Sequence, residues 1–281
     1  MIRHICFNGD LYPAKEFTVG IKNRAFRYGD GLFETMRSRG TTIPFFDYHY
    51  ERLFRGMDVM RMVPGMVNSS LLRESAERLI KADKLFNGNS IRISVFRKEG
   101  GKYAPLTNEV DFLIEVDSVA DNKFTLNDKG LFVDTYEEHF KSSSELGNFK
   151  NSSAALLVLA GINMQRRKLD DILILNENNV LVEALSSNVF IYKANKLITP
   201  SLKTGCVDGV MRRVILEIAS EQNIELKESN SLVPEDLLTS DEVFVSNAMR
   251  GINWVVAYKT KRYLYKMSRF LIAEINKKAG F

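Results

Sequence analysis

Residues 181–190 read LVEALSSNVF: two apolar stretches flank a short polar turn, and a single acid interrupts the first stretch. Apolar runs of this length, separated by small polar residues, predict two strands joined by a turn. Glu183 therefore lies on a predicted strand, where a carboxylate must face either water or a positive group. Position alone leaves both interpretations open, a turn or surface acid and the partner of a cation.

A second candidate for chemistry is Lys150, which lies 33 residues upstream and precedes the apolar run of a predicted helix over 152–168. A lysine at such a place is commonly a solvated residue near a helix cap. At a seam between domains, however, burial lowers the pKa of the amine and makes it nucleophilic toward carbonyl compounds. A nucleophilic lysine and a strand carboxylate together suggest pyridoxal phosphate, which needs a Schiff-base lysine and an acid against its pyridine nitrogen.

Such a cofactor also needs a cup for its phosphate. A helix predicted over 209–222 offers one, because Gly209 precedes Val210 and Met211, whose backbone N–H groups would be free at a helix N-terminus. Arg52 is a second candidate, since it lies on a predicted helix whose other residues at this spacing are apolar, and a guanidinium suits a phosphate. The simpler interpretation of a lone arginine is a surface salt bridge.

The chain has 281 residues, 45% hydrophobic and 26% charged, which is enough for one large domain or two mid-sized domains that each bury a core. The mixture of predicted strands and helices along the chain indicates an α+β protein with two domains. Predicted strands and helices lack the regular rhythm of a doubly wound parallel sheet. The polar stretch 119–130 is the expected connection between a small domain over 1–118 and a larger cofactor-binding domain over 131–281.

Several classes of protein are not expected. The net charge of +4 is spread along the chain and does not predict nucleic-acid binding. Cys6 and Cys206 are far apart and form no disulfide framework, and three scattered histidines do not predict a metal site. Because no signal peptide and no apolar run of about 18 residues is present, we expect a cytoplasmic protein that does not bind membranes.

Six motifs in order resemble the class IV aminotransferases, the fold-type IV pyridoxal-phosphate enzymes. They are NRAFRYGDGLFETMR (23–37), HYERL (49–53), FK (149–150), LVEALSSNVF (181–190), TPSL with GVMRR (199–213) and VSNA (245–248). The resemblance extends from about residue 5 to residue 255. It implies a two-domain α+β fold like that of D-amino-acid aminotransferase, with pyridoxal 5'-phosphate between the domains, and a homodimer.

The resemblance also implies roles for individual residues. Lys150 corresponds to the Schiff-base lysine, Glu183 to the partner of the pyridine nitrogen and Arg52 to the phosphate arginine. The other implied cofactor-binding residues are Asn188, Val210, Met211, Ser246 and Asn247.

Substrate-side residues favour the 4-amino-4-deoxychorismate lyase branch of the family. Thr35 stands where lyase-like sequences carry a threonine that assists proton transfer, although a β-branched residue also simply fills a strand position. Ala155 replaces a tyrosine often found in branched-chain aminotransferases, and Arg250 is either a carboxylate clamp or an exposed salt-bridge residue. The expected substrate residues are Tyr28, Phe33, Arg97, Tyr103 and Arg250.

We therefore expect a lyase that acts on a small carboxylate substrate and forms 4-aminobenzoate and pyruvate in the folate pathway. An amino-acid transaminase, for branched-chain or D-amino acids, is the main alternative. A non-catalytic protein that binds pyridoxal phosphate is a further alternative, which the presence of both Lys150 and Glu183 disfavours.

Overall fold

The chain forms two compact units in the computed structural model, which describes residues 3–281. The described part of unit 1 ends at Lys123 and also includes Phe149–Ser153, whereas unit 2 comprises Phe124–Asn148 and Ala154–Phe281. Both units mix helices with sheets, which confirms the predicted two-domain α+β class. The change of unit after Lys123 lies inside the stretch 119–130, but the return of 149–153 to unit 1 was not expected.

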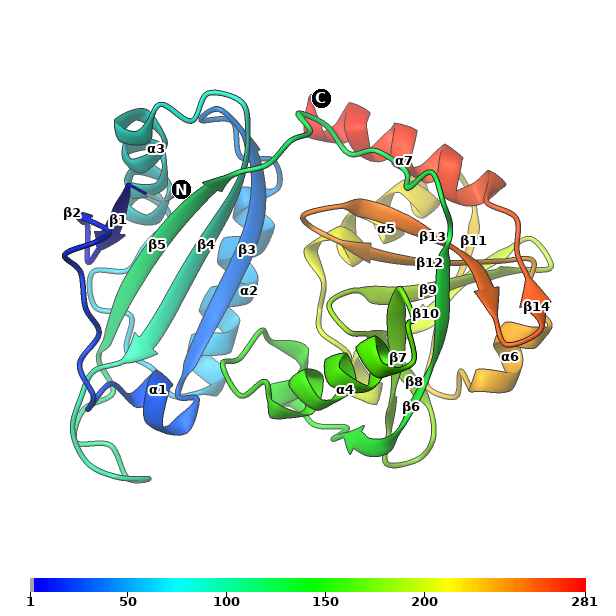
Figure 1. Ribbon diagram of the computed structural model, residues 1–281, viewed down its shortest axis with the longest axis horizontal. Coiled ribbons are helices and arrows are strands. Elements are labelled where there is room, and N and C mark those ends of the chain that lie inside the picture. Colours follow the sequence, from blue (N-terminus) through cyan, green and yellow to red (C-terminus); the bar gives the residue numbers. More distant parts are fainter. Residues whose placement is uncertain (1–2) are drawn as a thin grey trace. The chain divides into compact units, whose positions relative to one another are not determined.

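Unit 1 is built on one five-stranded antiparallel sheet in the order β2-β1-β5-β4-β3 (Figure 1). Its strands begin with a hairpin, in which Asn8 and Gly9 both have positive φ, as a two-residue loop of this kind requires. The elements of unit 1 are β1 (His4–Phe7), β2 (Asp10–Pro13), α1 (Arg24–Tyr28), β3 (Gly31–Arg39), α2 (Phe46–Val59), α3 (Ser69–Asp83), β4 (Gly88–Arg97) and β5 (Val110–Ser118).

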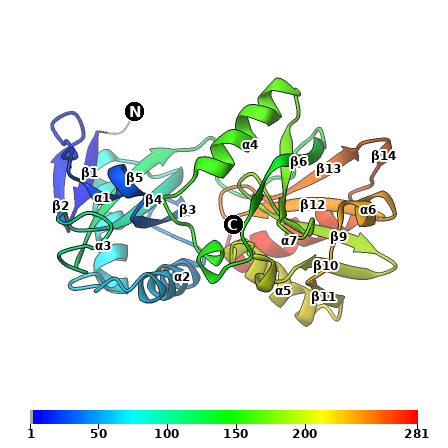
Figure 2. The same cartoon turned by 90° about the horizontal axis from the view of Figure 1, so that it is seen from below.

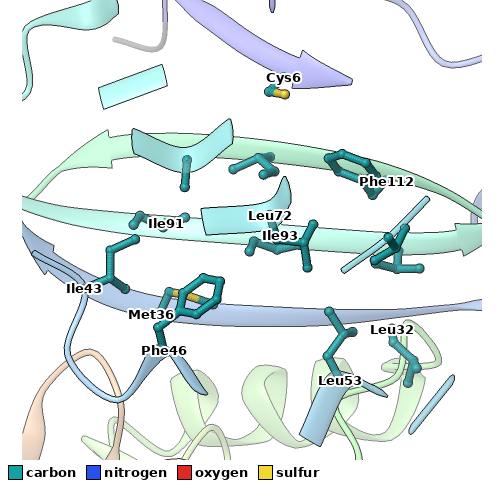
Figure 3. Packing of buried hydrophobic residues seen from close by; sticks show 14 of the residues in the cluster. Cys6, Leu32, Met36, Ile43, Phe46, Leu53, Leu72, Ile91, Ile93 and Phe112 are labelled. Atoms are coloured by element: carbon teal, nitrogen blue, oxygen red, sulfur yellow. The ribbon is translucent and has the colours of Figure 1, made fainter. Parts of the chain in front are cut away.

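The core of unit 1 lies between α2, α3 and one face of this sheet. Alternate residues of each strand point to this face, and on β4 these are Ile91, Ile93 and Val95. They pack against apolar residues of the two helices, among them Leu53 and Leu72 (Figure 3). Figure 2 shows α2 and α3 on the same side of the strands. The side chains of the intervening strand residues point to the opposite face of the sheet.

The segment Phe149–Ser153 extends the sheet at its free edge strand, β3. The N–H of Phe33 donates to the carbonyl of Lys150 at 2.8 Å, and the N–H of Ser152 donates to the carbonyl of Gly31 at 2.9 Å. Phe149 is buried in the core of unit 1, where it lies against Gly56 of α2. A β-carbon at Gly56 would come within 3.1 Å of the Phe149 ring, so a larger residue would require the ring to shift by a few tenths of an ångström.

Unit 2 contains a sheet of nine strands, in the order β11-β10-β9-β12-β13-β6-β7-β8 with β14 paired to β13. Its strands are β6 (Leu131–Lys141), β7 (Asp171–Asn176), β8 (Leu181–Ala184), β9 (Asn188–Lys193), β10 (Lys196–Pro200), β11 (Glu225–Ser229), β12 (Glu242–Asn247), β13 (Gly251–Tyr258) and β14 (Lys261–Arg262). Its helices are α4 (Ala155–Arg166), α5 (Val210–Glu221), α6 (Pro234–Leu238) and α7 (Lys266–Ala279), with short 3-10 turns η1 (Glu145–Asn148) and η2 (Leu202–Thr204).

Alternation along β9 and β12 divides the side chains of unit 2 between two faces. Val189, Ile191, Val243 and Val245 point into one buried apolar cluster. The residues between them point the other way, where α5 and α7 contact β12 (Figure 1). On that side the rings of Phe190 and Phe244 stack at 5.0 Å between centroids. Asn188 and Ser246 therefore face the side of α5 as well.

A buried acid caps helix α7. Glu242 begins β12 on the helix-facing side, and its carboxylate accepts hydrogen bonds from the N–H groups of Met267, at 2.8 and 3.0 Å, and Ser268, at 3.2 Å. The helix has no side-chain cap of its own. The negative charge also complements the positive end of the helix dipole. Across residues 3–281, none of the helices has the length and apolar character needed to cross a bilayer.

We expect Glu242→Ala to destabilise the protein because it leaves two buried N–H groups without an acceptor. The free energy of unfolding in urea should fall by about 1–3 kcal/mol. The matched control is Glu225→Ala on β11, where Glu225 forms an exposed ion pair with Lys196. This variant should change the free energy of unfolding little. Equal stability of the two variants would contradict the capping role of Glu242.

Candidate active site

Lys150 is held in place by its neighbours in the chain. Burial of Phe149 and the hydrogen bonds of the segment to β3 fix the backbone on both sides of Lys150, and Asn151 forms a β-bridge with Leu32. The ammonium of Lys150 lies 5.3 Å from the centroid of the Phe33 ring. Unit 1 therefore brings Lys150 together with Phe33, two residues that the sequence singled out separately.

Thr35 lies on the same face of the sheet as Phe33, two residues along β3. Its partner across the sheet is Arg92 of β4, and directly opposite residues share a face. The Arg92 guanidinium lies 3.9 Å from the centroid of the Phe33 ring, which confirms this arrangement. Phe33, Thr35, Arg92 and Lys150 thus form one patch that combines an amine, a guanidinium, an aromatic ring and a hydroxyl.

Arg52 points to the other face of the sheet, where it is buried against Glu34. Its Nε donates to Glu34 Oε1 at 2.8 Å and its Nη2 to Glu34 Oε2 at 2.5 Å. His49, one turn earlier on α2, lies with Nδ1 2.6 Å from Glu34 Oε2. Burial opposes ionisation of Glu34, but the charge of Arg52 and the hydrogen bonds from His49 and Arg52 outweigh it and lower the pKa of Glu34 to about 2.

Three of the expected substrate residues lie around the loop that follows β4. Tyr103 is 90% exposed, and its ring packs against Tyr28 at 5.6 Å between centroids. Arg97 is buried, and its guanidinium donates to Asp30, to Asn108 and to the carbonyls of Met60 and Arg61. The hydrogen bonds of the Arg97 side chain therefore hold this part of unit 1 together.

Glu183 belongs to unit 2 and faces a cation there. Its side chain is 6% exposed, and Oε1 accepts a hydrogen bond from the ammonium of Lys141 at 2.6 Å. Oε2 accepts a hydrogen bond from the backbone N–H of Val207 at 2.9 Å. Each oxygen has one donor and retains a second lone pair. Glu183 therefore faces a positive group, which was one of the two interpretations that the sequence left open.

The N-terminus of α5 forms a cup in unit 2. The helix begins at Val210 and has no side-chain cap, so the N–H groups of its first turn are available to an anion. Asn188 donates through Nδ2 to the carbonyl of Val207 at 2.7 Å, and its Oδ1 would lie 1.8 Å from a β-carbon at Gly209. Only glycine fits at that position, with Asn188 lying over it.

The remaining residues expected at the cofactor come from β12 and the turn that follows. The hydroxyl of Ser246 is buried and has no hydrogen-bond partner, and Ser246 is paired with Asn188 across β9 and β12. Asn247 organises the turn, because its Oδ1 accepts the N–H groups of Met249 and Arg250. The side chain of Arg250 is exposed. An unpartnered buried hydroxyl facing the side of a free helix N-terminus fits a phosphate oxygen.

Comparison with known proteins identifies the family. The family model described as amino-transferase class IV matches residues 31–258. The aminodeoxychorismate lyase of Bacillus subtilis is 28% identical over 253 residues, which cover 88% of this chain and 84% of that protein. A probable branched-chain-amino-acid aminotransferase of Aquifex aeolicus is 25% identical over 273 residues, 91% of this chain and 84% of that protein. The branched-chain aminotransferase of Thermoproteus uzoniensis has a similar structure, with a TM-score of 0.91, 19% identity and coverage of 100% and 96%.

The chain belongs to the class IV aminotransferase family and is a pyridoxal-phosphate-dependent enzyme. The residues described above fit this cofactor. Unit 1 supplies a lysine held by backbone hydrogen bonds, and unit 2 supplies a carboxylate together with a helix N-terminus beside an unpartnered hydroxyl. A lysine amine, a carboxylate and a phosphate cup are the three groups that pyridoxal phosphate requires.

Sequence analysis did not single out Glu34, His49, Arg92 or Lys141. Glu34 and Arg92 carried a usable signal, because each is a charged residue within a strand of alternating apolar residues, the same signal that identified Glu183. The contact of Lys141 with Glu183 depends on two elements 42 residues apart in the sequence and had no local signal.

We expect the stability that Glu34 contributes to disappear in acid. Its folded pKa of about 2 lies below the ordinary glutamate value of 4.5, so the contribution is present above about pH 4.5 and is lost as the pH falls toward 2. Glu34→Gln should therefore lower the free energy of unfolding by about 3 kcal/mol at pH 7, and the difference from wild type should shrink toward pH 3.

The control for this prediction is Glu109→Gln, at an exposed pair with Lys98. Its stability should follow the wild-type profile at every pH. A difference between Glu34→Gln and wild type that stays constant from pH 7 to pH 3 would show that Glu34 is not ionised in the folded protein.

Proposed function

We propose that this enzyme is a 4-amino-4-deoxychorismate lyase, which forms 4-aminobenzoate and pyruvate. The observation that carries the proposal is the position of Thr35 on the same face of β3 as Phe33, over whose ring the Lys150 ammonium lies. A hydroxyl near the reactive amine is suited to relay a proton to the ring that becomes aromatic. Similarity to the aminodeoxychorismate lyases of Bacillus subtilis and Vibrio harveyi, at 28% and 25% identity, supports the same choice.

Within this proposal the cofactor-binding roles are divided between the units. Lys150 provides the amine that bonds to the cofactor, and Arg52 contributes positive charge toward the phosphate. Arg52 is paired with Glu34, so its guanidinium is oriented before any phosphate arrives. In unit 2, Glu183 faces the pyridine nitrogen, and the backbone of Val210 and Met211 holds the phosphate. Asn188, Ser246 and Asn247 complete this side.

Pyridoxal phosphate, when bound, supplies an aldehyde for covalent bonding to amines and a protonated ring that withdraws electrons. The rest of the chemistry belongs to side chains. Lys150 is a base for the substrate's α-proton once its amine is released, and Thr35 passes a proton on the same face. Glu183 holds the proton at the ring nitrogen and so stabilises negative charge that develops on the substrate.

Arginine side chains account for recognition of an acidic substrate. Arg92 is exposed, stands opposite Thr35 and is oriented by the Phe33 ring, so its guanidinium is available to a carboxylate. Arg250, at the turn after β12, is a second candidate. Phe33, Tyr28 and Tyr103 supply aromatic surface, and the buried Arg97 supports the loop that carries Tyr103.

The proposal includes a homodimer that acts in the cytoplasm within the folate pathway. Val158, Leu159 and Ile162 are exposed on α4. Large apolar residues gathered on one helix are typical of a surface that another protein chain covers. No nucleic acid or membrane is part of the proposal.

A transaminase for branched-chain or D-amino acids is the second candidate. The Aquifex aeolicus relative and a D-alanine aminotransferase of Staphylococcus haemolyticus are each 25% identical to this chain. In a transaminase the cofactor machinery is the same, and the side chain of the substrate needs an apolar pocket rather than a proton relay. Assays of the purified enzyme with aminodeoxychorismate and with leucine or D-alanine plus 2-oxoglutarate separate the two.

Thr35→Val tests the lyase chemistry because it keeps the shape of the side chain and removes the hydroxyl. We expect release of 4-aminobenzoate to fall about tenfold or more, while the absorption spectrum of the bound cofactor stays unchanged. Thr42→Val, at an exposed position after β3, is the matched control and should retain full activity. A wild-type enzyme that forms no 4-aminobenzoate but aminates keto acids would overturn the lyase proposal.

Reduction with borohydride tests the identity of the reactive lysine. The treatment traps the cofactor on the amine to which it is bonded, and peptide mapping should find the pyridoxyl group on Lys150. Lys150→Ala should bind the cofactor without becoming labelled. A label on any other lysine would show that the site has been assigned to the wrong residue.

A further inference from the structure

We propose that Lys141 is a positioning residue that orients the Glu183 carboxylate and balances its negative charge, so that the proton shared between Glu183 and the ring nitrogen of the cofactor resides on the ring nitrogen. This inference rests on the proposed role of Glu183 opposite that nitrogen. None of the six family motifs includes Lys141. The proposal stands on the contacts of four residues within unit 2.

The Glu183 carboxylate is held at both oxygens before any ligand is present. The ammonium of Lys141 donates to Oε1 at 2.6 Å, and the N–H of Val207 donates to Oε2 at 2.9 Å. One donor is a side chain with full charge and the other is a backbone group without charge. Of the two, only Lys141 therefore determines how the negative charge of Glu183 is balanced.

Lys141 is itself fixed at the end of β6. The pairing of β6 with β7 shifts register between Tyr136 and Lys141, which places Lys141 opposite Asn176. Its ammonium also donates to the carbonyl of Gly147 at 3.1 Å, and the side chain is only 15% exposed. Gly147 in turn packs so closely on Gly205 that a β-carbon would lie 2.6 Å from the Gly205 carbonyl oxygen.

The charge of Lys141 decides where a shared proton resides. A proton between a carboxylate and a pyridine nitrogen goes to the stronger base, and a neighbouring cation favours the ionised form of a carboxylate. Lys141 contacts the carboxylate directly, so its positive charge stabilises the negative charge of Glu183. The proton then stays on the ring nitrogen, where it increases electron withdrawal.

A purely structural role is the alternative. In that case Lys141 would only tie the end of β6 to η1 through Gly147, and its removal would affect folding without affecting the proton on the cofactor. The two roles differ in one measurable quantity, the protonation of the ring nitrogen in the loaded protein. The ¹⁵N chemical shift of labelled pyridoxal phosphate reports it directly.

The experiment reconstitutes the full chain with cofactor labelled at the ring nitrogen and compares wild type, Lys141→Met, Lys141→Arg, Glu183→Gln and the double variant. We expect Glu183→Gln to shift the signal to that of an unprotonated ring, and Lys141→Met to move it most of that way. Lys141→Arg should restore the wild-type signal. The double variant should match Glu183→Gln, because Lys141 acts through Glu183. Turnover should follow the same order, with Lys141→Met losing about tenfold or more.

Lys196→Met, at an exposed pair with Glu225 in the same unit, is the control and should give the wild-type signal. If Lys141→Met fails to fold, as judged by circular dichroism, Lys141→Gln is measured in its place. A wild-type signal in the Lys141 variant together with a shifted signal in Glu183→Gln overturns this inference alone. A wild-type signal in Glu183→Gln overturns the proposed role of Glu183 itself.

Discussion

Alternation along the edge strand β3 is the constraint on which the arrangement of Phe33, Thr35 and Lys150 in unit 1 depends. Consecutive side chains of a strand point to opposite faces, so Phe33 and Thr35 are separated from Glu34 by the whole thickness of the sheet. β3 is paired with β4 along its full length, from Gly31 to Arg39, and this pairing fixes the register. A slip by one residue would bury Thr35 and expose the acid that holds Arg52.

The same strand also holds Lys150, the lysine of the proposed cofactor bond, through backbone hydrogen bonds. Hydrogen bonds from Phe33 and to Gly31 leave no freedom for the chain at Lys150, and the buried Phe149 ring prevents it from lifting away. The position of Lys150 is therefore set by backbone groups and by the Phe149 ring, which take no part in the proposed chemistry. The corresponding element in unit 2 is Val207, whose N–H binds Glu183 and whose carbonyl binds Asn188. One residue, Val207, thus links Glu183 to the N-terminus of α5.

Much of this arrangement was predictable from the sequence, because the signals are local. The helix that carries Arg52 corresponds to α2, and the helices predicted over 152–168 and 209–222 correspond to α4 and α5. The two strands predicted within 181–190 correspond to β8 and β9, and all of these predictions followed from turn residues and periodicity. The cup at Gly209 was visible because glycine directly preceded an apolar helix. The family motifs then identified the cofactor, which the match to residues 31–258 confirms.

What the sequence did not show depends on contacts between distant segments. Arg52 was expected to bind an anion. Its pairing with Glu34 could not be predicted without knowing which face of β3 packs against α2. Arg97 resembled a substrate residue, and only its four partners reveal the support that it gives to unit 1. The membership of 149–153 in unit 1 was likewise hidden, since its neighbours on both sides in the chain belong to unit 2.

That exchange of a five-residue segment limits how the gene for such a protein can be rearranged. A recombination event at the junction after Lys123 would transfer the sheet of unit 1 without Phe149–Ser153. The transferred unit would then lack Lys150 and the buried Phe149 ring that holds this segment in place. The incoming partner would have to provide a segment that matches both the β3 edge and the space beside Gly56. We therefore expect new specificities to arise from point changes and loop insertions rather than from an exchange of whole units.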